Sequence, residues 1–189
     1  MPRAGLSEEV VVAEAARLAD EIGYDRVTLA AVADRFDVAV PSLYKHVSGR
    51  EALQQCIAVR ALRELGAAVS TAAVGRAGGD ALRAIADAYR TYAREHPGGY
   101  AATLRAPQPG DAAHDAHEAA SAALLETVFA VLRGYGLSGD DAIDATRAIR
   151  AALHGFTSLE AAGGFGMPRD VDRSFARLVD ALDTALAGW

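Results

Sequence analysis

The sequence has few of the residues that would suggest a secreted or membrane protein. It contains one cysteine, Cys56, so no disulfide can form within the chain and a reducing compartment is favoured. No run of about 18 unbroken apolar residues occurs, so no membrane-spanning helix is expected. The N-terminal stretch carries several acidic side chains and lacks a long apolar core, which is not the pattern of a secretory signal. We therefore expect a cytoplasmic protein with no membrane partner.

Lysine is as scarce as cysteine. Lys45 is the only lysine, and every other basic residue is an arginine. It stands in the stretch FDVAVPSLYKHVSGREAL (36–53), in a chain whose formal net charge is −6. Residues 26–50 carry four basic and two acidic side chains, whereas residues 1–25 carry more acidic than basic ones. Positive charge is therefore concentrated around this stretch.

Signatures of catalysis and of β-structure are also missing. The sequence has no G-x-G-x-x-G, Walker or nucleophile-elbow motif and no convincing pair of catalytic carboxylates. We expect no enzyme activity and no cofactor. Alanine is frequent, β-branched residues are sparse outside short runs, and no alternating strand pattern occurs, which together favour helices.

Helical periodicity and cap residues predict an all-α chain of about nine helices. An N-terminal three-helix, helix-turn-helix domain is expected over 1–47. A C-terminal helical bundle is expected over 48–189. The predicted helices span 7–22, 28–36, 41–47, 48–73, 80–95, 99–105, 111–135, 138–162 and 170–187.

The second and third helices are joined by a tight turn at Asp37-Val38, the arrangement of a helix-turn-helix. Aspartate tolerates the left-handed conformation that such a turn requires better than most residues do. In the third helix, Leu43 and Val47 are four apart and are expected to pack inward.

The opposite face of the third helix carries hydrogen-bond donors. Ser42, Lys45 and His46 lie at i, i+3 and i+4 and are expected to share this face, which Val40 and Tyr44 extend. Hydroxyl, ammonium and imidazole groups can bind phosphate oxygens, and a small apolar side chain can contact a thymine methyl group. The positive patch is modest, so two copies are needed for firm binding to DNA. The alternative is that these residues are ordinary surface groups of a small bundle.

SLYKHVSGREAL resembles the end of the DNA-binding region of the TetR/AcrR family of transcriptional regulators, and VTLAAVADRFDVAV resembles that family's second helix and turn. The resemblance implies a dimeric, all-helical regulator with a DNA-binding domain over 1–47 and a ligand-binding and dimerisation domain over 48–189. We expect a homodimeric repressor that binds a palindromic operator and is released by a small ligand. Asp37 replaces the family's usual glycine, and Val40 stands where polar base-reading residues often occur. The DNA-binding residues implied or proposed are Thr28, Val40, Ser42, Tyr44, Lys45, His46 and Arg50.

The C-terminal half offers two further features. ALHGFTSLEAAGGFG (152–166), with its Leu-His-Gly run, resembles the C-terminal domain of the WHG-type subgroup of that family. The eighth and ninth helices carry long apolar stripes that predict a dimer interface; alternatively, both stripes face their own core. An apolar or amphipathic effector is expected to bind among Tyr89, Tyr92, His96, Tyr100, Leu104, Phe129 and His154.

Two other hypotheses remain open. His114, His117 and Glu118 lie at i, i+3 and i+4, so an all-helical metal-binding protein or enzyme is the alternative to a regulator. The simpler interpretation is that these three residues lie in a solvated first helical turn, and no metal is assigned. The other hypothesis is a helix-turn-helix repressor that responds to no ligand.

Overall fold

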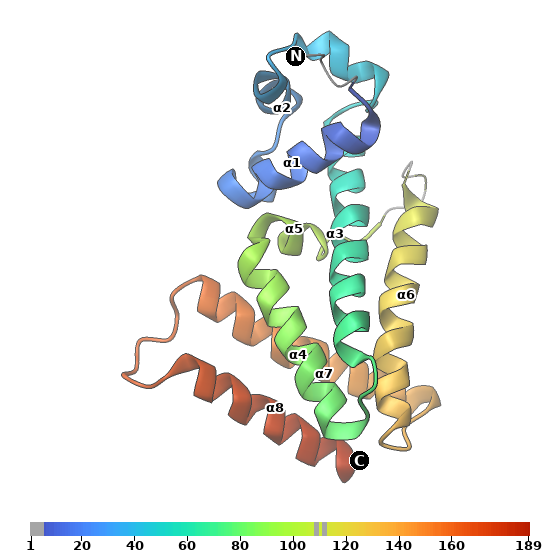
Figure 1. The fold of residues 1–189 in the computed structure, drawn as a ribbon, viewed down its shortest axis with the longest axis vertical. Coiled ribbons are helices and arrows are strands. Elements are labelled where there is room, and N and C mark those ends of the chain that lie inside the picture. Colours follow the sequence, from blue (N-terminus) through green and yellow to red (C-terminus); the bar gives the residue numbers. More distant parts are fainter. Residues whose placement is uncertain (1–5, 108–109, 111–112) are drawn as a thin grey trace. The chain divides into compact units, whose positions relative to one another are not determined.

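The structure is a computed structural model that describes residues 6–107, 110 and 113–189 (Figure 1). The described residues contain α-helices and 3-10 helices and no strand, which confirms the predicted all-α fold. None of the described helices is long and apolar enough to span a membrane. The elements are α1 (Glu8–Ile22), η1 (Tyr24–Arg26), α2 (Leu29–Phe36), η2 (Val40–Lys45), α3 (Arg50–Ala73), α4 (Gly78–Glu95), α5 (Pro97–Ala102), α6 (His114–Arg133), α7 (Gly139–Ala161) and α8 (Val171–Ala187).

All nine predicted helices are present among these elements, with two differences. The third is the 3-10 helix η2, and the additional 3-10 turn η1 follows α1. The start predicted for the seventh helix at Asp111 lies outside the described residues.

The chain forms two compact units. The first combines 1–64 with 95–121, and the second combines 65–94 with 122–189. The boundaries of these two units reflect how the chain packs. The division between a DNA-binding domain that ends at residue 47 and a ligand-binding domain that begins at residue 48 stays a prediction.

The first unit is built around α1, α2, η2 and the start of α3. Ser7 and Thr28 cap α1 and α2, because their side-chain oxygens accept from Val10 N at 3.3 Å and Ala31 N at 3.1 Å. Its core side chains with no exposed surface are Val11, Ala15, Ala19, Val27, Val32, Leu43, Leu53, Ile57 and Ala102.

A close crossing of α1 and α5 also lies in the first unit. A Cβ atom added at Gly98 would lie 2.1 Å from the carbonyl carbon of Ala19, so the two backbones touch where only glycine fits. Asp20 Oδ1 accepts from the amides of Gly98 and Gly99, both at 2.9 Å. Its Oδ2 lies 3.1 Å from His96 Nδ1. A carboxylate of α1 thereby caps the start of α5.

The second unit contains a buried ionic cluster. The guanidinium of Arg90 on α4 donates to Glu160 on α7 at 2.8 and 2.5 Å and lies 2.7 Å from Asp172 on α8. It also lies over the rings of Phe156 and Phe175. Since Arg90 is only 8% exposed, these contacts compensate the cost of burying its charge and join three helices.

Candidate DNA-binding surface

The turn between α2 and η2 has the predicted left-handed residue. Asp37 has φ 52° and ψ 47° and is the one non-glycine residue with positive φ in the described part of the chain. The amide of Val38 donates to Ala33 O at 3.1 Å, which closes the end of α2. The chain therefore leaves α2 at a fixed angle and enters η2 as a helix-turn-helix does.

The segment η2 has 3-10 rather than α-helical geometry. Ser42 N donates to Ala39 O and His46 N donates to Leu43 O, both at 2.8 Å, so the bonds are of the i to i+3 type. With three residues per turn, Ser42 and Lys45 fall on the same side. His46 is the C-cap residue just after η2, and its place on that face stays a prediction.

The buried side of η2 agrees with the prediction. Leu43 has no exposed surface and Val47 is 5% exposed. Tyr44 is 57% exposed, Lys45 is exposed, and Ser42 is half-buried. The segment thus packs its leucine and valine inward and presents polar groups outward.

The basic residues near η2 differ in their contacts. Arg50 donates through Nε to Val27 O at 3.1 Å and through Nη2 to the carbonyl of Asp25. Arg35 pairs with Glu14 at 3.1 Å and also with Glu21. Both guanidinium groups therefore hold helices together, a role that the sequence does not reveal.

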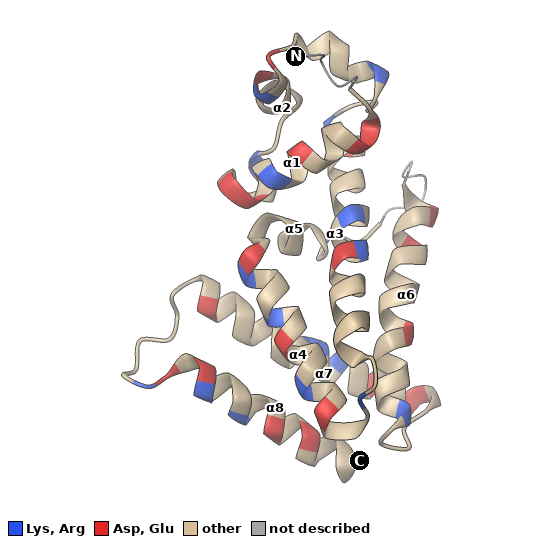
Figure 2. Cartoon of the chain, in the orientation of Figure 1, with Lys and Arg blue, Asp and Glu red and all other residues tan. Residues whose placement is uncertain are grey.

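Lys45 makes no ion pair with any residue that the structure describes. Acidic residues lie toward both ends of α1, while α2 carries one arginine and one aspartate (Figure 2). The positive charge of Lys45 is therefore not neutralised within the described chain.

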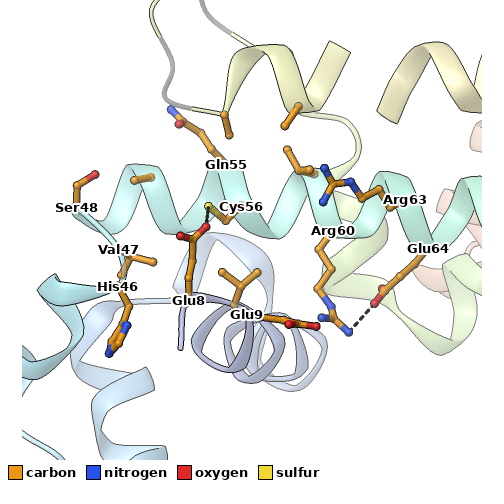
Figure 3. Close-up of a pocket in the computed structure, with 15 residues that line it drawn as sticks. Glu8, Glu9, His46, Val47, Ser48, Gln55, Cys56, Arg60, Arg63 and Glu64 are labelled. Atoms are coloured by element: carbon orange, nitrogen blue, oxygen red, sulfur yellow. Dashed lines mark hydrogen bonds and ion pairs between the residues drawn. The ribbon is translucent and has the colours of Figure 1, made fainter. Parts of the chain in front are cut away.

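A groove of about 860 Å³ adjoins the end of η2 in the first unit (Figure 3). It is lined by α1, α3, residues 46–48 and the beginning of α6, and His46 is one of the lining residues. Cys56 Sγ lies 3.9 Å from Glu8 Oε1 in this groove. Burial, followed by the nearby Glu8 carboxylate, raises the pKa of the Cys56 thiol, which disfavours the reactive thiolate.

The predicted effector-binding residues are divided between the two units. The first unit holds a buried Tyr100 and a Leu104 that is 45% exposed, together with His96. The second unit holds a buried Tyr92 and a His154 whose Nδ1 lies 3.3 Å from Ser158 Oγ. It also holds Tyr89 and Phe129, both half-buried. Their grouping around one effector stays a prediction.

The three residues of the metal alternative do not converge. Glu118 Oε1 lies 3.4 Å from His114 Nε2, and His117 Nδ1 lies 3.5 Å from Ser121 Oγ. No group of three or more His, Cys, Asp or Glu side chains that could hold a metal occurs in the described part of the chain. A site built from His114, His117 and Glu118 is therefore not supported.

Comparison with known families covers both halves of the chain. Residues 11–55 match the model of the bacterial regulatory proteins of the tetR family. Residues 82–182 match the tetracyclin repressor-like C-terminal domain.

Individual relatives agree with these matches. An HTH-type transcriptional regulator of Mycobacterium tuberculosis is 38% identical over 160 residues, which cover 85% of this chain and 72% of the relative. The HTH-type transcriptional regulator YobS of Bacillus subtilis is 36% identical over 178 residues, which cover 93% and 90% of the two chains.

Solved structures show the same fold. A protein of unknown function from Rhodococcus sp. RHA1 is 25% identical, covers 99% of both chains and superposes with a TM-score of 0.78. A variant of TetR from Acinetobacter baumannii AYE in complex with minocycline is 24% identical, covers 97% of this chain and 96% of its own, and has a TM-score of 0.67.

Proposed function

The chain belongs to the TetR family of transcriptional regulators, and we propose that it is a repressor that binds a palindromic operator as a homodimer and is released by a small molecule. Family membership identifies a DNA-binding regulator rather than an enzyme. In this proposal the partner is double-stranded DNA and the site of action is the cytoplasm.

The observation that carries the DNA-binding proposal is the outward side of η2. The exposed Tyr44 and Lys45 and the half-buried Ser42 offer a phenol, an ammonium and a hydroxyl next to the fixed turn at Asp37. These groups donate to phosphate oxygens, which positions a segment on the duplex without reading sequence. Val40, half-buried at the start of η2, is the candidate for an apolar contact with a thymine methyl group.

The remaining DNA-binding residues have a supporting part in this proposal. Thr28 caps α2 through its oxygen, and its hydroxyl proton stays available to a phosphate near that helix start. Arg50 uses Nε and Nη2 on backbone carbonyls, and its Nη1 is left for DNA. His46, the C-cap residue just after η2, is the last of these candidates.

The dimer is proposed to form through α7 and α8. Some side chains of their apolar stripes are buried within the chain, namely Ile149, Leu153, Phe175, Val179 and Leu186. Phe156, Leu178 and Leu182 are half-buried. Ile143 and Leu159 are 41% and 53% exposed, so they remain available to a second copy. Two copies double the phosphate contacts of one weakly basic segment, which is the physical reason for dimeric binding.

The effector is proposed to be a small apolar or amphipathic molecule. TetR of Acinetobacter baumannii AYE has been solved with minocycline, and this chain carries the aromatic residues Tyr89, Tyr92, Tyr100 and Phe129 in its helices α4, α5 and α6. An effector need shift the DNA-bound equilibrium by only about 1–3 kcal/mol to change occupancy substantially.

The test is selection of duplexes from a random pool by the purified protein, followed by gel-shift titration of the enriched site and a scrambled control. The proposal expects enrichment of an inverted repeat and tighter binding to it than to the scrambled duplex. Enrichment of no common site would contradict it.

A compound screen on the same protein–DNA complex tests the effector. We expect a molecule that raises the melting temperature of the protein and releases the DNA. If no compound does so, a repressor that responds to no ligand is favoured.

A further inference from the structure

We propose that Gln55, His114 and His117 bind one divalent transition-metal ion of the zinc class. The three side chains line a cavity of about 10 Å³ within the first unit, between α3 and the first turn of α6. Gln55 Oε1, His114 Nδ1 and His117 Nε2 are buried and have no hydrogen-bond partner among the described residues. Gln55 as a whole is only 8% exposed. Three unpartnered polar atoms around one cavity are unusual, because a buried polar group left without a partner destabilises the fold.

The outer nitrogen of each imidazole has a partner that orients the ring. His114 Nε2 lies 3.4 Å from the carboxylate of Glu118, and an ionised carboxylate only accepts. Nε2 therefore carries the proton, and Nδ1 presents a lone pair to the cavity. His117 Nδ1 lies 3.5 Å from Ser121 Oγ; in the tautomer that donates to that oxygen, Nε2 presents a lone pair to the cavity. Metal-ligating histidines are held in this way, with the second nitrogen bonded to a carboxylate or another oxygen.

In these tautomers the inner atoms are three acceptors: two imidazole nitrogens and one amide oxygen. Acceptors cannot hydrogen-bond to one another, so they require a cation or a donor molecule in the cavity. A volume of about 10 Å³ admits one atom-sized occupant and excludes an organic effector. Two imidazoles with one oxygen suit zinc and its neighbours better than magnesium or calcium, which prefer oxygen ligands alone.

This donor set differs from the one expected from sequence. Glu118 lies behind His114 and orients it, while the third ligand is Gln55, which lies 59 positions earlier than His114 in the chain. Arg105 also lines the cavity, and its positive charge opposes a cation there. Its Nη2 lies 3.4 Å from Glu51 Oε1, which offsets part of that charge. The site is independent of the proposed DNA binding, because none of its ligands belongs to that surface.

The proposal is tested with untagged full-length protein by equilibrium dialysis against ZnCl₂ and by the visible spectrum after addition of CoCl₂. One ion per chain and a cobalt absorption band are expected. His114→Ala and His117→Ala should each weaken zinc binding by at least about tenfold. His154→Ala is the matched control, because His154 Nδ1 also lies near a serine hydroxyl one turn on, yet His154 is not one of the residues that line this cavity.

Circular dichroism establishes that each variant is folded, and His114→Gln and His117→Gln replace any alanine variant that is not. Absence of zinc binding by the wild-type protein would overturn the proposal. So would zinc binding that both histidine variants retain in full, since that is the behaviour of adventitious surface binding.

Discussion

At the scale of single residues, Lys45 and Arg50 differ although both are basic and close in sequence. Lys45 is exposed and makes no ion pair with the described residues, so its charge is available to a phosphate. Arg50 bonds the carbonyls of Val27 and Asp25 and thereby fixes the start of α3 against the segment before α2. The first residue should matter for binding and the second for stability.

Lys45→Ala is expected to weaken binding to operator and scrambled duplex alike. Because the variant cannot neutralise one phosphate, the slope of log K against log salt should become shallower by about one.

Tyr44→Phe should also weaken binding to operator and scrambled duplex alike. Fluorescence anisotropy at several salt concentrations measures both, with Arg133→Ala as a control that removes an exposed charge at the end of α6. Weakening confined to the operator would contradict the assignment to phosphate.

Arg50→Ala is expected to lower the free energy of unfolding by about 1–2 kcal/mol, because two charge-assisted hydrogen bonds to backbone carbonyls disappear. Urea denaturation measures this, and Lys45→Ala should leave the midpoint unchanged. Equal stability of the Arg50 variant and the wild type would show that these bonds contribute nothing.

Local sequence patterns predicted the backbone conformation or the burial of some residues correctly. Asp37 adopts the left-handed conformation expected of it, and Leu43 and Val47 are buried as expected. The role of Arg50 was not predictable, since its partners are carbonyls of the main chain 23 and 25 residues earlier. Nor was the convergence of Gln55 on two histidines, which depends on how α3 packs against α6.

At the scale of elements, the crossing of α1 and α5 depends on a glycine. Gly98→Ala should lower the free energy of unfolding by about 1–3 kcal/mol or more, because its Cβ would overlap the backbone at Ala19. Gly66→Ala on α3 is the control: its Cβ would meet nothing nearer than 3.7 Å, so neutral or slightly stabilising behaviour is expected. Denaturant titration of both variants distinguishes them, and equal midpoints would rule out the close approach.

The ionic cluster of the second unit predicts a pH dependence. Hydrogen bonding to Arg90 lowers the pKa of Glu160 below its usual value of 4.5. A lowered folded-state pKa stabilises the fold above the unfolded value, and this stabilisation disappears as pH falls through the folded value. Glu160→Gln should cost about 2 kcal/mol at neutral pH. Its unfolding free energy should fall less steeply below pH 4.5 than that of the wild type, as measured by urea titrations at several pH values.

Helical periodicity predicted the elements because most helices here are amphipathic and bounded by Gly, Pro or cap residues. It could not distinguish the 3-10 helix η2 from an α-helix, since Pro41 suits the first turn of both. The tighter winding keeps Ser42 and Lys45 on one side of η2 and leaves His46 just beyond its end. The groove beside α1 has no sequence signal either, because three helices distant in sequence form it.

At the scale of the whole molecule, the proposed mode of binding requires two chains for one operator. Ile143→Glu and Leu159→Glu place a charge on the exposed parts of the α7 stripe and should convert the dimer to folded monomers that bind DNA weakly. Val74→Glu, at a position 73% exposed just after α3, is the control and should leave the dimer intact. Size-exclusion chromatography with light scattering provides the measurement; dimers of unchanged affinity in both α7 variants would place the interface elsewhere.

DNA binding by paired η2 segments is tested most directly by a titration of the selected duplex with purified protein at low ionic strength, repeated as salt is raised. We predict saturation at two chains per inverted repeat, and an affinity whose logarithm falls linearly with the logarithm of salt concentration. An absence of affinity for duplex DNA at the lowest salt concentration, from folded protein, would contradict this mode of binding.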